Sequence, residues 1–398
     1  MNITGFRFEE LTGTLEEPPA EHYAERLSRP IDLYEEFREA RDHYGDGIDR
    51  DDASIDVTQT FLFVETDEGV TGMAGPINRG TARLAARYED LLCGRDPLAT
   101  EMLWDLLYRE AVHGRKGHTM MAISAIDVAL WDLKGKTFGE PVVRLLGGPT
   151  RETLPTYASM LRFPVDPAAV QDRAADFKER GFEAQKWFFR YGVGSGREGQ
   201  QHNAALVEAA RSAVGPEYDL MFDAWMSWDR TYALEMFDRI AEYNPRWVEE
   251  PVQPDKIDQY AELREAAPFP IAGGEHEYTR WGVHELLDRA AVEVLQVDTY
   301  WGGGITEMRH ICSLASAHDI PVIPHGHSVP ANAHLVAAHP PNVCPLVEYL
   351  VQHNKQLQLF FDEPVHPEDG DVTVPDRPGI GVDIDEAQVE ERRTVTFD

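Results

Sequence analysis

The feature that most constrains this chain is a series of charged residues that follow short apolar segments at nearly constant spacing. The residues are Asp223, Glu249, Glu275, Asp298 and His325. Successive separations are 249 − 223 = 26, 275 − 249 = 26, 298 − 275 = 23 and 325 − 298 = 27 residues. A (β/α) barrel divides about 250 residues among eight strand–helix repeats, so each repeat has about this length. The spacing therefore predicts that each residue lies at the carboxyl end of a successive barrel strand.

Three of these residues are consecutive carboxylates, which we interpret as a metal site. The carboxyl ends of barrel strands form one ring, where this fold builds its active sites, so Asp223, Glu249 and Glu275 would face one point. Clustered anions need a hard cation to neutralise them, and oxygen ligands with room for water suit Mg²⁺. The alternative is an ordinary acidic surface, because the chain has 70 Asp and Glu. Chance would not place acids only after apolar segments at repeat spacing.

Asp298 and His325, one repeat apart, predict an acid/base pair. A histidine alone more often has a structural role in a core or a loop. A carboxylate on the neighbouring strand, however, can orient an imidazole and raise its basicity, which is what a general base requires.

The rest of the chain has the organisation of a two-domain α/β protein. Residues 3–13 and 57–77 have the pattern of strands, with a hairpin turn at 66–69, and helical spacing follows from 82 to 136. Beyond residue 148, short β-rich segments alternate with helical stretches, at 154–160, 182–189, 219–222, 247–248, 270–272, 292–297 and 320–323. This alternation is typical of βαβ units. We therefore predict a modified TIM (β/α) barrel preceded by a small α+β module, and 398 residues suffice for both.

A long insertion separates the first two predicted strands. Residues 14–52 are acidic, rich in aromatic side chains and weakly periodic, which is typical of either a functional lid or a surface loop. We predict that this insertion and the tail beyond residue 351 belong to a domain that closes over the barrel mouth and shields the reacting substrate from water. The side chains that we expect to select the substrate are Tyr23, Arg26, Tyr34 and Tyr44.

The net charge excludes polyanionic partners. Lys and Arg total 37 against 70 Asp and Glu, so the formal charge is 37 − 70 = −33. Neither nucleic acid nor an anionic membrane would bind so acidic a chain. Seven of the 37 cations are lysines, and this acidic, lysine-poor composition leads us to expect a halophilic protein that stays soluble in high salt.

Cysteine spacing and the start of the chain predict a reducing compartment. Cys93, Cys312 and Cys344 show no C-x-x-C spacing, so the sequence indicates neither a disulfide framework nor a thiolate zinc site. The first ten residues lack the basic and apolar regions of a signal peptide, and no apolar run of about 18 residues occurs. We expect a soluble cytoplasmic protein.

Several stretches carry motifs of a known family. They are H-G-R-K-G at 113–117, residues 122–136, F-D-A-W-M-S at 222–227, W-V-E-E-P at 247–251, G-E-H at 274–276, Q-V-D at 296–298 with W-G-G-G at 301–304, and P-H-G at 324–326. These stretches resemble the enolase superfamily, specifically the rhamnonate dehydratase-like acid-sugar dehydratases of its mandelate racemase branch. The tail at 375–381 resembles the family's return to its capping domain. The resemblance implies an α+β capping domain formed by residues 1–135 and 351–398, with the barrel at 136–350.

The resemblance also implies roles for individual side chains. It implies that Asp223, Glu249 and Glu275 bind Mg²⁺ and that Asp298 and His325 form the acid/base pair, in agreement with the spacing. Glu348, 348 − 325 = 23 residues beyond the histidine, falls where the family keeps an acid that hydrogen-bonds the substrate carboxylate. Lys186 occupies the first position of the family's K-x-K motif and would contact the same carboxylate. A structural ion pair with a neighbouring Glu is the alternative for this lysine.

Phe188 marks a departure from the racemases of this branch, which usually have a second lysine base at this position. Its absence favours an elimination, in which His325 takes the C2 proton and then gives it to the leaving C3 hydroxyl. We therefore predict a lyase that dehydrates an aldonate to a 2-keto-3-deoxy acid through an enediolate. A racemase, epimerase or cycloisomerase of the same superfamily is the alternative. The side chains expected to bind the small-molecule sugar acid are Arg162, His276, Trp301 and His327, and we expect a homo-oligomer.

Two interpretations from outside the family stay open. Residues 194–199 read G-S-G-R-E-G, which fits the G-x-G-x-x-G pattern of an NAD-dependent oxidoreductase, although residues 189–194 separate the motif from the preceding strand. A non-catalytic sugar- or calcium-binding protein could use the same oxygen ligands. Such a protein would not require the pair of Asp298 and His325.

Overall fold

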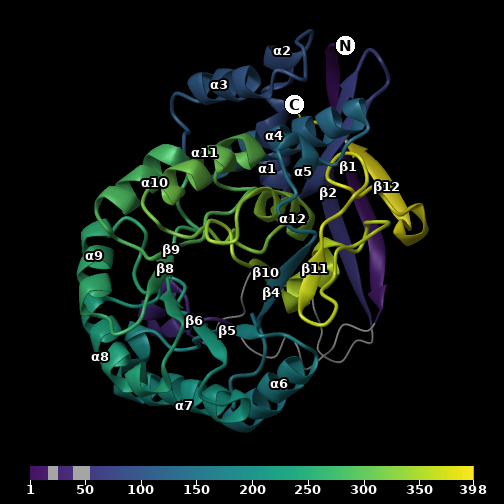
Figure 1. The fold of residues 1–398 in the computed structure, drawn as a ribbon. Helices are drawn as coiled ribbons and strands as arrows, with labels where there is room; N and C mark the ends of the chain where they lie inside the picture. Colours follow the sequence, from purple (N-terminus) through teal and green to yellow (C-terminus); the bar gives the residue numbers. More distant parts are fainter. Residues whose placement is uncertain (17–25, 39–53, 398) are drawn as a thin grey trace.

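The chain folds into a small antiparallel sheet with helices and a curled parallel sheet ringed by further helices (Figure 1). This computed structural model describes residues 1–16, 26–38 and 54–397. The arrangement confirms the predicted α/β fold, a modified (β/α) barrel with a capping domain.

The capping domain is built on one antiparallel sheet. Its strands are β1 (Ile3–Glu16), β2 (Ser54–Thr66), β3 (Thr71–Ile77) and β12 (Glu391–Val395), in the order β12-β1-β2-β3. The predicted turn joins β2 to β3, where the Gly69 amide donates to the Thr66 carbonyl over 3.1 Å. Because β12 pairs with β1, the C-terminal end of the chain completes a sheet that the N-terminal end begins.

Helices cover this sheet and connect it to the barrel. They are α1 (Arg79–Ala86), α2 (Glu89–Leu92), α3 (Thr100–Glu110), α4 (His118–Phe138) and α5 (Val142–Leu145). α4 is buried on nearly every side because it lies between the cap sheet and the barrel helix α11 (Gly304–Ser316). This position explains why its sequence is apolar almost throughout. The domain boundary predicted at residue 135 falls inside α4, and the division into domains stays a prediction.

The barrel sheet is parallel and curls back on itself. Its strands are β4 (Thr153–Ser159), β5 (Ala184–Phe188), β6 (Asp219–Asp223), β7 (Trp247–Glu249), β8 (Ile271–Gly273), β9 (Val294–Leu295) and β10 (Val347–Leu350), in the order β10-β4-β5-β6-β7-β8-β9. At the position of the seventh barrel strand, Val322 forms an isolated parallel bridge with Leu295. The Val322 amide also donates to the Val343 carbonyl over 2.8 Å, which continues the ring towards β10. Six of the seven predicted segments contain a strand, β4 to β9, whereas the segment 320–323 forms only the isolated bridge, and β10 was not among the predicted segments.

Helices surround the outside of the barrel (Figure 1). They are α6 (Pro167–Glu179), α7 (Gly196–Val214), α8 (Arg230–Ile240), α9 (Ile257–Ala266), α10 (Thr279–Asp288), α11 and α12 (Val329–Ala338). Outward-facing strand residues such as Leu220 and Phe222 pack against this layer, whereas Met221 belongs to a separate cluster with Trp247 inside the ring. The alternation follows from the two-residue period of a strand. The core therefore has an inner and an outer part.

The C-terminal segment passes along the barrel before it reaches the cap. α13 (Val351–Leu357) follows β10 directly, and β11 (Asp371–Thr373) pairs antiparallel with β4. Short 3-10 helices occur at Pro30–Leu33 (η2), Glu35–Phe37 (η3), Val193–Ser195 (η5), Ala241–Tyr243 (η6) and Glu386–Gln388 (η7). Among the described residues, no helix combines the length and the apolar character that a bilayer-spanning segment needs.

Candidate active site

The predicted metal ligands converge at one end of the barrel. Asp223 lies two residues after the inward-facing Met221, and Glu249 lies two residues after the inward-facing Trp247, so both carboxylates face the ring interior. Glu275 follows β8 at the same end. One oxygen from each of the three carboxylates lies within 4.8 Å of the others, and all three side chains are buried. The structure thus brings these residues to one point.

Lys186 lies among these carboxylates. Its ammonium Nζ is 2.8 Å from both oxygens of Glu249, 2.8 Å from Oε1 of Glu348 and 3.5 Å from Oδ2 of Asp223. Although burial opposes the charge, Glu249 and Glu348 raise the pKa of Lys186 well above its usual value. The ammonium is therefore a fixed positive charge shared by three acids, which is more than a simple ion pair.

Negative charge nevertheless exceeds positive charge at this point. Four buried carboxylates, those of Asp223, Glu249, Glu275 and Glu348, lie close to one ammonium. Burial, followed by the charge of Glu249, raises the pKa of Asp223 well above its usual value, and burial raises the pKa of Glu249 to about 7 against the effect of Lys186. A divalent cation would offset most of this excess, and a set of buried carboxylate oxygens fits Mg²⁺.

Hydrogen bonds hold the acids in place. The Trp225 amide donates to Oδ1 of Asp223 over 2.8 Å, and the Gln296 side-chain amide donates to Oε2 of Glu249 over 2.8 Å. The Gly326 amide donates to Oε2 of Glu348 over 2.9 Å. Donors fixed by the fold orient the oxygens before any ligand binds, and such preorganisation favours tight metal and substrate binding.

The two residues predicted to act as an acid/base pair lie in contact. Nδ1 of His325 lies 2.7 Å from Oδ2 of Asp298, whose other oxygen accepts from the amides of Tyr300 (2.6 Å) and Trp301 (3.0 Å). The Asp298 carboxylate, which only accepts, therefore directs the other ring nitrogen, Nε2, towards the metal ligands, 3.6 Å from Oε1 of Glu275. Although burial opposes it, the charge of Glu275 and the hydrogen bond that His325 donates to Asp298 raise the pKa of His325 to about 10.

Glu250, next to the predicted ligand, has a different partner. Its Oε2 lies 2.7 Å from Nδ1 of His276. Although burial opposes it, Glu250 and then Glu275 raise the pKa of His276 to about 9. His276 and Glu250 with Glu275 form a second group of potential ligand atoms within 4.8 Å of one another. The all-carboxylate group suits Mg²⁺ better, because Mg²⁺ prefers oxygen ligands and a protonated His276 offers no free lone pair.

Two of the predicted substrate-binding residues, His276 and His327, lie beside the indole of a third, Trp301. The Trp301 ring centroid lies 5.0 Å from that of His325, 6.0 Å from that of His276 and 5.8 Å from that of His327. Burial lowers the pKa of His327, and its buried Nδ1 has no hydrogen-bond partner among the described residues. Together they form a flat wall with polar edges beside the acid/base pair.

Arg162, the fourth predicted substrate-binding residue, follows β4 with a left-handed φ of 70° and is buried. Its charge also acts on His353. Burial, followed by the charges of Arg162 and His325, lowers the pKa of His353 to about 3. His353 in α13 is therefore neutral.

The described part of the insertion, residues 26–38, contacts the barrel mouth. Leu27 packs with Phe188 and Leu350, and the Ser28 amide donates to the Phe189 carbonyl over 2.8 Å. This placement agrees with the predicted lid. Two of the four side chains proposed to select the substrate, Arg26 and Tyr34, lie in this described part. Tyr23 and Tyr44 lie outside the described residues, Tyr34 is 59% exposed, and Arg26 pairs with Asp32 of the same segment over 2.7 Å.

The glycine-rich motif at 194–199 has a packing role in this fold. A Cβ atom on Gly194 would lie 2.3 Å from the Asp32 carbonyl oxygen, so a side chain there would displace residues 26–38. The motif spans the end of η5 and the first turn of α7. The close approach to Asp32 thus explains Gly194 without a dinucleotide.

Sequence reasoning missed two residues that position the site. Gln296, which holds Glu249, precedes Asp298 by two residues, so the two-residue period of an extended segment could have placed it on the same face. Asn332 in α12 donates to the His325 carbonyl over 2.7 Å and accepts from the Thr299 hydroxyl over 2.6 Å. No pattern in the sequence marks this asparagine, because its contact depends on how α12 packs.

Comparison with known proteins identifies the family. Residues 54–147 match the mandelate racemase/muconate lactonizing enzyme N-terminal domain, and residues 169–388 match the enolase C-terminal domain-like family. The chain belongs to the enolase superfamily, in its mandelate racemase branch. Enolase-superfamily enzymes use Mg²⁺ as their cofactor, in agreement with the predicted metal.

Members of the superfamily with known activities cover nearly the whole chain. D-galactarolactone cycloisomerase from Agrobacterium fabrum is 36% identical over 349 residues, which cover 83% of this chain and 90% of that enzyme. L-rhamnonate dehydratase from Saccharopolyspora erythraea is 35% identical over 391 residues, which cover 94% and 93%. The structure of rhamnonate dehydratase from Gibberella zeae complexed with Mg gives a TM-score of 0.83 at 31% identity and covers 97% of this chain and 95% of that one. These relatives support an acid-sugar dehydratase or cycloisomerase.

Proposed function

We propose that this protein is a Mg²⁺-dependent dehydratase that converts an aldonate into a 2-keto-3-deoxy acid. The observation that carries the proposal is the asymmetry of the site. His325 with Asp298 provides an acid/base group, whereas Phe188, in register with Asp223 on the neighbouring strand, stands where a second lysine base would be needed for racemisation. An elimination can proceed with one such group.

The proposed ligands of the metal are Asp223, Glu249 and Glu275. Mg²⁺ held there would supply positive charge that stabilises the substrate carboxylate as it gains negative charge. The ammonium of Lys186, 2.8 Å from Glu348, would bind the same carboxylate from the other side. Lys186 and the three proposed metal ligands are buried and held in place, so they can stabilise the intermediate with little reorganisation during the reaction.

His325 would act twice. Its neutral Nε2 takes the proton from C2 of the substrate and leaves an enediolate, while Asp298 stabilises the imidazolium through the 2.7 Å contact at Nδ1. The imidazolium then gives this proton to the C3 hydroxyl, which leaves as water. The resulting enol takes a proton from solvent at C3, loses the proton of its C2 hydroxyl to solvent, and becomes the 2-keto-3-deoxy acid. A metal bound by Glu275 would also lower the pKa of His325, because it removes the charge that raises it most.

The wall around Trp301 suits the hydroxyl groups of a sugar chain. His276 and His327 present ring nitrogens beside the flat indole, and polar edges on an aromatic wall are typical of carbohydrate sites. Arg162 at the end of β4 is a further donor that we propose for the distal part of the substrate.

Cycloisomerisation of a sugar lactone is the second candidate, because a D-galactarolactone cycloisomerase covers 83% of this chain at 36% identity. Such a reaction also needs a base beside a carboxylate. It differs in its product, since the leaving group is a ring oxygen of the substrate and no water is lost.

The test is to incubate the protein with Mg²⁺ and rhamnonate, xylonate, gluconate or arabinonate, and with aldaric acid lactones, in high salt and in dilute buffer. Formation of a 2-keto acid with loss of one water, abolished by a chelator and restored by Mg²⁺, is the expected result. Comparison of the activity in high salt with that in dilute buffer tests the proposed halophilic character. Exchange of the α-proton with epimerisation, or turnover in excess chelator, would contradict the proposal. Conversion of a lactone into a product of the same mass, without release of water, would favour the cycloisomerase.

A further inference from the structure

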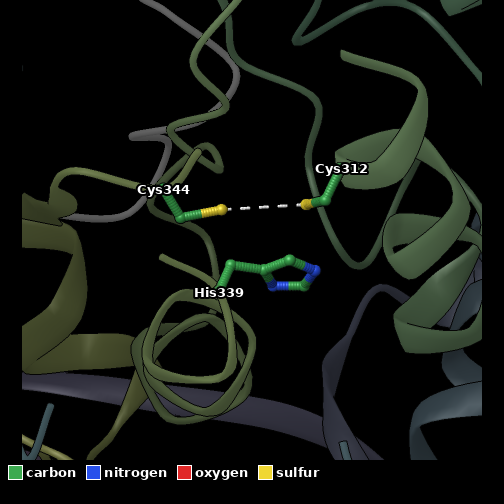
Figure 2. Close-up of side chains that lie close together, drawn as sticks. All are labelled: Cys312, His339 and Cys344. Atoms are coloured by element: carbon green, nitrogen blue, oxygen red, sulfur yellow. Dashed lines mark hydrogen bonds between the residues drawn. The ribbon is translucent and has the colours of Figure 1, made fainter. Parts of the chain in front are cut away.

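Two cysteines and a histidine lie together at the end of the barrel opposite the active site. Cys312 is in α11, His339 follows α12, and Cys344 precedes β10 (Figure 2). One ligand atom from each lies within 4.8 Å of the others. Both cysteines are free thiols and fully buried, and His339 is partly buried. Spacing along the chain does not reveal this group, which is why the sequence indicates no thiolate site.

The separation of the two sulfurs fits a shared metal ion. The Sγ atoms of Cys312 and Cys344 are 3.8 Å apart. Two sulfurs bound to one tetrahedral Zn²⁺ with bonds of about 2.3 Å lie about 3.8 Å from each other, whereas a disulfide needs about 2.05 Å. The pair could therefore bind a tetrahedral metal without a movement of the backbone.

A hydrogen bond fixes the imidazole of the third residue. Nδ1 of His339 lies 2.8 Å from the Leu335 carbonyl oxygen. A carbonyl only accepts, so Nδ1 carries the hydrogen and the neutral ring has its lone pair on Nε2. A histidine that donates its other N–H to a carbonyl is the usual arrangement in metal sites, because the bond fixes the tautomer and the ring orientation.

A cation also holds the backbone of two of these residues. The Arg151 guanidinium donates to the Cys344 carbonyl over 2.5 Å and to the His339 carbonyl over 3.2 Å. The Thr150 hydroxyl donates to the same His339 carbonyl over 2.9 Å. The segment before β4 therefore fixes the spacing of the two residues.

We propose that Cys312, His339 and Cys344 form a structural site for a thiophilic d¹⁰ cation, Zn²⁺ or Cu⁺. Both are selected by thiolate and imidazole ligands, unlike the Mg²⁺ of the carboxylate site. Binding breaks the two S–H bonds, forms two metal–sulfur bonds and one metal–nitrogen bond, and releases two protons to solvent without any change of oxidation state. Because His339 faces partly outward, water can complete a four-coordinate Zn²⁺.

The location explains what such a site would do. Between β9 and β10, the described backbone joins the ring through the isolated bridge of Val322 and its 2.8 Å bond to the Val343 carbonyl. Cys344 is the next residue in the chain. A metal would tie this seam to α11 and α12, and a site on the face opposite the catalytic residues stabilises a barrel without entering its chemistry.

The experiment uses Co²⁺ as a probe that distinguishes the two metal sites. Chelator-treated protein in the presence of reductant is titrated with Co²⁺ after saturation with Mg²⁺. We expect an intense near-ultraviolet thiolate-to-cobalt charge-transfer band and visible bands of tetrahedral Co²⁺, which carboxylate ligands cannot produce. One equivalent of Zn²⁺ should displace the cobalt and raise the thermal midpoint. A parallel titration with Cu⁺ distinguishes a two-ligand from a three-ligand site. In His339→Gln, Cu⁺ bound by the two sulfurs alone would still bind. Zn²⁺ affinity in the same variant should fall at least tenfold.

Variants separate the site from other thiols. Cys93→Ser, outside the cluster, should keep the charge-transfer band, whereas Cys312→Ser and Cys344→Ser should lose it. Because a buried serine could impair folding, Cys312→Ala provides a second test, with circular dichroism and Mg²⁺ binding as measures of the folded state. Absence of the band in folded wild-type protein would overturn the proposal. So would an oxidant-formed Cys312–Cys344 disulfide in protein that binds neither Zn²⁺ nor Cu⁺, since the pair would then be a redox cross-link.

Discussion

Buried carboxylates occur in both the capping domain and the barrel mouth, and the two regions neutralise them differently. In α4, Asp132 accepts from the amides of Met73 (2.8 Å) and Ile380 (2.9 Å) and pairs with Lys136 over 2.9 Å. Each of its oxygens therefore has a donor supplied by the fold. At the barrel mouth, in contrast, Asp223 and its neighbours share one lysine.

The comparison teaches that burial of an acid does not by itself mark a functional site. Asp132 joins β3, α4 and the C-terminal tail, so its carboxylate acts as a structural connection between segments distant in sequence. Burial raises the pKa of Asp132 as well, but at the mouth the charges of neighbouring carboxylates add to burial and raise the pKa values of Asp223 and Glu249 further. Uncompensated charge in a concave site is the feature that indicates function.

The largest effect should come from the acid that has a catalytic partner. Asp298→Asn replaces an acceptor by an amide that can donate to His325 and so stabilise the wrong tautomer. We expect kcat to fall by about 10³-fold or more, with Mg²⁺ affinity changed less than about threefold. Steady-state kinetics and calorimetric titration of Mg²⁺ measure the two quantities. A wild-type rate would eliminate the acid/base pair, and intact sugar-acid binding with no turnover even in wild type would favour a binding protein.

Two adjacent glutamates provide the next test, because only one should hold the metal. Glu249→Gln removes a charged ligand, and we expect Mg²⁺ affinity to fall by about 100-fold. Glu250→Gln is the matched control, since Glu250 pairs with His276. Its effect on Mg²⁺ affinity should be less than about tenfold. Equal losses in the two variants would mean that the metal uses the group of Glu250, Glu275 and His276 instead.

The structural acid of the cap should affect stability and leave metal binding unchanged. Asp132→Asn places an amide donor against an amide donor and removes the partner of Lys136, so we expect a loss of about 2 kcal/mol in the free energy of unfolding. Urea denaturation measures this loss. Asp105→Asn is the control, because the ion pair of Asp105 with Arg109 is about half exposed and contributes little. A weakened Mg²⁺ affinity in Asp132→Asn would break the distinction between the two regions.

These contrasts also show how far the sequence could lead. The catalytic-face residues were predictable because each closes an apolar strand at repeat spacing, so one-dimensional periodicity determines the position around the ring. The first strands and helices of the cap followed from local apolar patterns, and the return of the C-terminal segment to the cap came from the family resemblance. The strand β12 was not predicted, because no local pattern indicates that it pairs with β1. Asn332 and the group of Cys312, His339 and Cys344 were not predictable. They depend on the packing of α11 and α12, which sequence spacing does not specify.

The smallest effect concerns Asp127, an acid of the cap that lacks the full set of donors and so tests the comparison most closely. Its Oδ2 accepts from the Thr306 amide at the start of α11 over 2.9 Å, and Gly304 leaves room for this approach, since a Cβ there would lie 2.4 Å from Oδ2. Its Oδ1 has no partner among the described residues. Burial raises the pKa of Asp127 from 3.8 to about 7.

A raised pKa of this kind gives stability a defined pH dependence. Between pH 3.8 and about 7 the folded chain holds a proton on Asp127 that the unfolded chain has released. The stabilisation from this group is therefore complete below pH 3.8 and is lost as the pH rises through about 7. Asp127→Asn keeps an acceptor for Thr306 but does not titrate, so its free energy of unfolding should fall less steeply with pH than that of wild type in this window, by up to about 1.4 kcal/mol per pH unit. At pH 8 the variant should be at least as stable as wild type, because it buries no charge. Urea denaturation in saturating Mg²⁺ at pH 5, 6, 7 and 8 measures the difference. Parallel pH profiles for the two proteins would mean that Asp127 stays ionised when folded, and that the cap, like the barrel mouth, tolerates a buried charge without a compensating proton.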